Sequence, residues 1–161
     1  MNSYAAALAG LPGMGPARLA AILGRWSPEE AWRRVVAGTA HLPGCEGGSV
    51  SETWRHEARR IDPASVAAAH RAAKVDVHVN GQPSYPEVLA ADHEAPAVLF
   101  SLGDVAALDG RRVGIVGTRA CSRYGRDVAY QLGRDLAASG VRVVSGLALG
   151  VDGAAHGGVL D

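Results

Sequence analysis

The chain has 161 residues, 48% of them hydrophobic and 20% charged, and its 16 basic and 16 acidic side chains give a formal net charge of zero. This composition indicates a soluble globular protein with one domain and part of another, and it argues against a disordered chain or one that is basic throughout. No apolar stretch approaches the roughly 20 residues that span a bilayer, and the N-terminus lacks the basic segment of a signal peptide. Cys45 and Cys121 lie far apart without a partner motif, which argues against a disulfide framework or a zinc site and favours a cytoplasmic location.

Residues 1–74 are predicted to form a helical domain. Its clearest helix starts are Ser27-Pro28 and Asp62-Pro63, because a Ser or Asp side chain can cap the first turn and proline fits the first helical position. Residues 4–8 and 17–23 are expected to start two more helices, and residues 51–60 to form another. The hydrophobic pattern changes after Lys74, where we place the domain boundary.

Two features of this helical part allow either a structural or a DNA-binding interpretation. The turn at Gly13 and Gly15 resembles that of a helix–hairpin–helix motif, in which backbone N–H groups bind a DNA phosphate. A structural turn between packed helices explains the same residues, and we prefer it. Trp26, Trp32 and Trp54 fall within helical apolar patterns, so we expect them in the core rather than as platforms for base stacking.

The period of the sequence changes at Val75. Val75, Val77 and Val79 alternate with polar residues, which is typical of a half-buried strand, and Asn80-Gly81 is a turn signal that closes it. Another short strand is expected at residues 97–101.

A βαβ unit is predicted for residues 112–144. Short apolar strands at 112–117 and 141–144 flank a helix at 123–139 that Gly140 ends. The two strands should be parallel and the crossover right-handed. Along the helix, Val128, Leu132 and Leu136 recur on one apolar face.

The loops after these two strands must leave the same edge of the sheet, where open α/β folds bind ligands. The second loop, residues 145–150, leads into a helix that Asp152 is expected to cap, and its free backbone N–H groups suit a phosphate. A surface ion pair for Arg119, a capping role for Ser122 and a purely structural role for the glycines are the alternatives. The residues expected to bind phosphate or DNA are Gly117, Thr118, Arg119, Ser122, Arg123, Ser145, Gly146 and Gly150.

Basic side chains gather in the βαβ unit although the whole chain is neutral. Residues 111–144 hold seven arginines and two aspartates, whereas residues 1–110 hold nine basic and 12 acidic side chains. A local basic surface attracts a polyanion even on a neutral protein. For Arg134 and Arg142 we prefer the simpler interpretation, a solvated position on the surface.

Two sequence blocks, GIVGTRACSRYG at 114–125 and SGLALGVDGAAH at 145–156, resemble the signature of the DprA/Smf family of DNA-processing proteins. The resemblance implies an α/β chain (α+β overall), with a helical SAM-like or helix–hairpin–helix-like domain at 1–74 and the first part of an extended Rossmann-like parallel-sheet domain at 75–161. It also implies single-stranded DNA binding, loading of the recombinase RecA during natural transformation, and a homodimer in the full-length protein. Relatives often carry basic residues where this chain has Leu149 and Gly157.

We expect no catalytic residue, metal or cofactor. Asp152 and His156 share a helix face, but a capping aspartate and a packed histidine explain them more simply than an acid–base pair does. The chain lacks a Walker loop and a G-x-G-x-x-G after either strand, so it gives no support for an ATPase or a dinucleotide enzyme. The alternatives to a DNA binder are a nucleotide-processing phosphoribohydrolase that uses the same crevice and a protein-interaction fragment working through residues 1–74.

The sheet domain is expected to be incomplete at Asp161. A parallel sheet is normally buried on both faces, so a sheet with few strands should expose an edge and apolar surface. We therefore expect a fragment that is prone to self-association, with residues 1–74 as its better-protected part.

Overall fold

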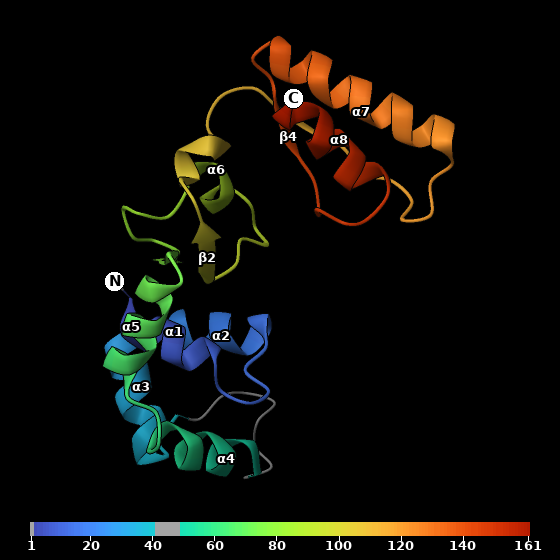
Figure 1. The fold of residues 1–161 in the computed structure, drawn as a ribbon. Helices are drawn as coiled ribbons and strands as arrows, with labels where there is room; N and C mark the ends of the chain where they lie inside the picture. Colours follow the sequence, from blue (N-terminus) through green and yellow to red (C-terminus); the bar gives the residue numbers. More distant parts are fainter. Residues whose placement is uncertain (1, 41–48) are drawn as a thin grey trace. The chain divides into compact units, whose positions relative to one another are not determined.

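The computed structural model describes residues 2–40 and 49–161, which divide into two compact units, Met1–Asp104 and Val105–Asp161 (Figure 1). Cys45 and the second Leu-Pro-Gly sequence at 42–44 lie outside the described residues. None of the helices in the described ranges has the length and apolar character needed to cross a membrane.

The first unit begins with the predicted helices, and their starts follow the expected rules. The Ser27 hydroxyl accepts a hydrogen bond from the Glu30 N–H at 3.3 Å, and both carboxylate oxygens of Asp62 accept from backbone N–H groups in the next turn. A proline occupies the first helical position after each of these caps. The helices are α1 (Ser3–Ala9), α2 (Pro16–Leu23), α3 (Pro28–Ala37), α4 (Ser49–Ala58) and α5 (Pro63–Ala72).

The main hydrophobic core lies among these helices. Trp32 and Trp54 are 6% and 1% exposed, and the Trp54 indole N–H donates to the Pro12 carbonyl at 2.9 Å. This bond fastens α4 to the turn that precedes α2, and Gly13 in that turn is exposed. Trp26 differs from the other two tryptophans, because it lies only partly buried at the margin of the core.

The first unit also holds an antiparallel pair of strands, β1 (Val75–Val79) and β2 (Val98–Leu102), with the short helix α6 (Glu87–Ala90) between them. Val77, Val79 and Val98 join the core of the helices. The predicted alternation is correct for the valines, but His78 is buried too, with its Nε2 atom 2.9 Å from the Ser101 hydroxyl.

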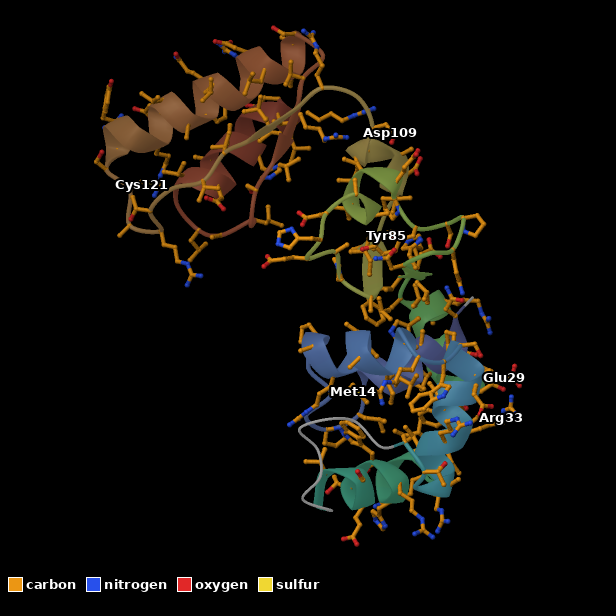
Figure 2. The ribbon with its side chains drawn as sticks, turned by 180° about the vertical axis from the view of Figure 1, so that it is seen from behind. Met14, Glu29, Arg33, Tyr85, Asp109 and Cys121 are labelled. Atoms are coloured by element: carbon orange, nitrogen blue, oxygen red, sulfur yellow. The ribbon has the colours of Figure 1, made fainter. Side chains whose placement is uncertain are left out.

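The segment between the strands folds back on the same unit. Tyr85 lies in it (Figure 2) and donates its hydroxyl hydrogen to the Pro96 carbonyl at 2.8 Å. Because β1 contacts α1 and α5, the contacts place residues 75–104 with the helices. The compact division therefore falls after Asp104, later than the sequence boundary placed near Lys74.

The second unit holds the predicted βαβ unit and one further helix. A short 3₁₀ turn, η1 (Val105–Leu108), precedes β3 (Arg112–Gly114), α7 (Arg123–Ala138), β4 (Arg142–Val144) and α8 (Val151–Leu160). β3 and β4 are parallel, with Val113 opposite Val143, which confirms the predicted pairing. Both strands are shorter than predicted, although the Ile115 N–H still donates to the Val144 carbonyl at 2.9 Å.

Small residues join α7 to α8, which lie side by side (Figure 1). A Cβ atom on Gly133 would overlap the Ala155 carbonyl, and one on Gly158 would overlap the Tyr130 carbonyl. Of the predicted apolar face, Leu136 packs against the core of this unit, whereas Val128 and Leu132 are 46% and 47% exposed. Large side chains cannot enter a contact at which two helix backbones approach this closely, so the small residues of α7 face α8.

Candidate nucleic-acid interface

The two predicted loops, residues 117–122 and 145–150, touch each other directly at Gly150. Gly150 has a φ of +87°, and a Cβ atom there would overlap the carbonyl groups of Thr118 and Arg119. The N–H of the next residue, Val151, donates to the Thr118 carbonyl at 3.3 Å. The expectation that the carboxyl ends of the two strands bring these loops together is therefore confirmed.

Asp152 fixes this contact from inside. Its side chain is 3% exposed, and its Oδ1 and Oδ2 atoms accept hydrogen bonds from the N–H groups of Gly117 and Ala148 at 3.3 and 3.5 Å. The residue before α8 is Gly150, which has no side chain that could cap the helix. The predicted capping role of Asp152 is therefore wrong: its carboxylate connects one loop to the other.

Fewer backbone N–H groups are free at the start of α8 than the sequence suggests. The N–H groups of Val151, Gly153 and Ala154 donate to the carbonyls of Thr118, Ala148 and Gly150 at 3.3, 3.0 and 3.0 Å. A buried carboxylate lies in the same turn. Since a phosphate at a helix N-terminus needs free N–H groups, these bonds leave fewer of them for the predicted phosphate site on this helix end, which stays a prediction.

Ser145 and Gly146 lie in the second loop, and neither belongs to the lining of the groove that Arg119 and Gly150 line. The Ser145 hydroxyl accepts from the Leu147 N–H at 2.9 Å and lies 2.8 Å from Nε2 of His156. Leu147 adopts a φ of +51°, a left-handed conformation that this turn requires. His156 is thus a hydrogen-bonding histidine that holds the loop, as its simpler interpretation predicts.

The first loop is braced by its own hydroxyl groups. Thr118 Oγ1 accepts from the Ala120 N–H at 3.2 Å, and Ser122 Oγ accepts from the Gly125 N–H at 3.1 Å. Ser122 is therefore the cap of α7, and Cys121 lies beside it in the loop (Figure 2). Arg123 begins α7 and is exposed.

A groove of about 550 Å³ opens where these loops meet α7. Of the eight predicted binding residues, Arg119 and Gly150 line it directly. Gly117 and Thr118 hold its wall through the bonds described above. Its lining residues are Arg119, Arg126, Leu147, Ala148, Leu149, Gly150, Gly153 and Ala154.

Arg126 lines the groove as well, although the sequence analysis did not single it out as a site residue. Like Arg119, it makes no hydrogen bond or ion pair with any other residue in the described part of the chain, whereas Arg134 lies 3.6 Å from Asp135. Two guanidinium groups without carboxylate partners at one groove suit a phosphate, which arginine binds through paired hydrogen bonds. The available signal was its position, one helical turn after Arg123 at the start of α7.

The rim of the groove is apolar. Leu147 and Leu149 are 71% and 81% exposed. Among residues 2–40 and 49–161, no cluster of three His, Cys, Asp or Glu residues could hold a metal ion.

Comparisons with known proteins show the family of this chain. The sequence profile of the family described as DNA recombination-mediator protein A matches residues 76–161, which is more than half of the chain. The chain is 40% identical over 92 residues to the DNA processing protein DprA of Bacillus subtilis (strain 168), a match that covers 56% of this chain and 31% of that protein. It is 50% identical over 70 residues to a putative DNA processing protein DprA of Mycobacterium tuberculosis (strain ATCC 25618 / H37Rv), covering 42% of this chain and 18% of that protein.

The fold is similar to a solved structure as well. The X-ray structure of DNA processing protein A (DprA) from Streptococcus pneumoniae matches with a TM-score of 0.70 and 26% sequence identity, covering 99% of this chain and 54% of that one. By contrast, the chain spans less than a third of the length of the Bacillus subtilis and Mycobacterium tuberculosis proteins.

Proposed function

Because the chain belongs to the family of DNA recombination-mediator protein A, we propose that it binds single-stranded DNA through the groove formed by Arg119, Arg126 and the loop at Leu147–Gly150. The DNA contacts are to the sugar–phosphate backbone and have little sequence preference. The groove then acts as a holding site for the strand, and no chemical step takes place in it.

The observation that carries this proposal is the pair of arginines. Arg119 and Arg126 line one groove, and neither has an intramolecular partner among the described residues. A guanidinium group that has no ion-pair partner can bind a phosphate without first breaking another bond. Arg119 and Arg126 can therefore each bind one phosphate of the same strand. Residues 111–144, which hold them, carry seven arginines against two aspartates, and such a local excess attracts a polyanion.

The remaining polar groups support a binding role rather than an enzymatic one. Asp152 is buried on two backbone N–H groups, and His156 is bonded to Ser145, so both are engaged in holding the loops. A general base must reach a reacting group in the groove. Neither residue belongs to the lining of the groove.

We extend the proposal to the wider role of the family. A strand held by its phosphates keeps its bases free to pair, which is the state that a recombinase such as RecA needs. On this basis we propose that the full-length protein presents single-stranded DNA to RecA during natural transformation, acts in the cytoplasm and works as a homodimer.

A fluorescence anisotropy titration with labelled oligo-dT tests the binding step. The same titration with a duplex of equal length and a competition with AMP serve as the two comparisons. We expect saturable binding of oligo-dT, weaker binding of the duplex and no competition by AMP. Preferred binding of AMP would instead favour the nucleotide-processing alternative, and a lack of oligo-dT binding would contradict the proposal.

A further inference from the structure

We propose that a second groove, in the first unit, is a binding site for a single nucleobase, with Trp26 as its stacking platform. The groove measures about 530 Å³, within the range of roughly 300–1,000 Å³ typical of small-molecule sites. It lies between the turn that joins α2 to α3 and the turn that follows β1. The lining residues are Ala20, Leu23, Gly24, Arg25, Trp26, Ser27, Pro28, Val79, Asn80, Gly81, Gln82, Ala95 and Ala97.

Trp26 is held in place but not enclosed. Its backbone N–H donates to the Ile22 carbonyl at 3.1 Å, and the guanidinium carbon of Arg34 lies 4.9 Å from the centre of its indole ring. Arg34 is itself fixed by Glu30, at 2.7 Å between Nε and Oε1. Arg34, held by Glu30, therefore contacts the indole ring and orders it before any ligand binds.

The indole of Trp26 also has an unused polar group. Its N–H finds no acceptor among the described residues, whereas the indole of the buried Trp54 is bonded to Pro12. A partly buried tryptophan at a groove offers a flat apolar surface for stacking, which is worth roughly 1–3 kcal/mol per base in single-strand binding proteins. Trp26 thus has the features of a platform that the other two tryptophans lack.

Two carboxamides line the same groove. Asn80 and Gln82 flank Gly81, whose φ of +86° makes the turn, and neither side chain has a hydrogen-bond partner within the described ranges. A carboxamide presents one acceptor and one N–H₂ donor, the combination that pairs with the edge of a base. Both amides are therefore available for a ligand with donors and acceptors in one plane.

The lining of the groove is mostly uncharged. Arg25 is the one ionisable side chain in the lining given above, and the other polar side chains are neutral. The indole and the two carboxamides therefore suit a planar heterocycle with donors and acceptors at its edge. The inference goes beyond the proposed function, because it requires neither Arg119 nor Arg126.

Titration with adenosine and with thymidine, followed by tryptophan fluorescence, tests the site without involving a phosphate. We expect saturable quenching of the wild-type chain, loss of that quenching in Trp26→Phe, and about 3- to 10-fold weaker binding for Asn80→Ala and for Gln82→Ala, the range for one lost hydrogen bond. Gln131→Ala, an exposed glutamine on α7, is the matched control and should bind as the wild type does.

The Arg119→Ala/Arg126→Ala double variant, which lacks the two arginines of the proposed phosphate groove, distinguishes a base of single-stranded DNA from a free nucleoside or nucleotide. Quenching by oligo-dT but not by an abasic strand of equal length assigns the site to a base of single-stranded DNA, and quenching by the nucleosides alone assigns it to a free nucleoside or nucleotide. The proposal is overturned if neither nucleoside quenches saturably, if ribose 5-phosphate quenches equally, or if Asn80→Ala and Gln82→Ala bind as the Gln131→Ala control does.

Discussion

The backbone N–H of Gly117 donates to the buried carboxylate of Asp152 at 3.3 Å, and this bond joins residues that lie 35 positions apart in the chain. Gly117 also packs tightly on the first residue of α8, since a Cβ atom there would lie 2.6 Å from the Cβ atom of Val151. The loop after β3 and the start of α8 are therefore fixed to each other. Arg119 and Gly150, which line the groove, owe their placement to this connection.

Replacing Asp152 should destabilise the second unit. Asp152→Ala leaves the N–H groups of Gly117 and Ala148 without acceptors in a buried position, and we expect the free energy of unfolding to fall by about 1–3 kcal/mol. Asp127→Ala, at an exposed position on α7, is the control and should change it by less than about 0.5 kcal/mol. Urea unfolding of both variants measures the difference, and equal effects would mean that the carboxylate does not hold the loops.

Neighbouring glycines of α8 should respond to alanine with opposite signs. Gly158→Ala places a methyl group against the Tyr130 carbonyl, and overpacking of this kind costs about 1–3 kcal/mol. At Gly157 the added Cβ atom would lie 3.7 Å from the Tyr130 ring, an ordinary contact, so Gly157→Ala should stabilise the helix by about 0.5–1 kcal/mol. Thermal unfolding of the two variants separates these outcomes, and stabilisation by both would contradict the close contact between α7 and α8.

Elements with local signals were predictable from the sequence. Ser27, Asp62 and Ser122 cap helices as expected, because a cap depends only on residues within the next turn. The parallel pairing of β3 and β4 was predictable as well, since the spacing of a βαβ unit leaves few alternatives.

Features that depend on close approach were not predictable. Hydrophobic periodicity selected Val128 and Leu132 for the inner face of α7, yet Ala129 and Gly133 are the buried residues, because the backbone of α8 comes too near for larger side chains. The role of Asp152 depends on a bond to a residue in another loop, and a helix-start position alone suggests a cap. Arg126 became visible as a site residue only when its groove and its missing partner were known.

Acid should weaken the start of α5. Hydrogen bonds from the Ser65 hydroxyl and from the N–H groups of Ala64 and Ser65 lower the pKa of Asp62 from its ordinary value of 3.8. A carboxyl group with a lowered pKa in the folded state stabilises the fold above its unfolded pKa, and this contribution is lost as the pH falls through the folded pKa. The difference in stability between the wild type and Asp62→Ala should therefore be constant near neutral pH and shrink below about pH 3.8.

Urea unfolding of the wild type and of Asp62→Ala at pH 7 and at pH 3 measures how the contribution of Asp62 to the free energy of unfolding changes with pH. Glu87→Ala, at an exposed position at the start of α6, controls for general effects of charge. A difference that grows as the pH falls would have the wrong sign and would refute the capping account.

Hydrogen exchange should show the helices of the first unit to be better protected than the strands of the second. The core of the second unit rests on Ile115, Ala129 and Ala155, whereas Val113 and Val144 on its strands are 38% and 41% exposed. Few buried apolar contacts allow local opening at low cost. If the amides of residues 113–116 and 141–144 in a monomeric sample are protected as strongly as those of α1 and α3, this expectation fails.

The central claim is that Arg119 and Arg126 hold the phosphates of a single strand, and oligo-dT anisotropy titrations over a range of salt concentrations test it most directly. Arg119→Ala and Arg126→Ala should each weaken binding by about 1–3 kcal/mol and reduce the slope of log K against log salt by about 0.7, the value for one phosphate contact on a single strand. Arg134→Ala, whose side chain lies beside Asp135, should have a much smaller effect. Equal losses in all three variants, or an affinity that does not change with salt, would contradict a defined phosphate groove.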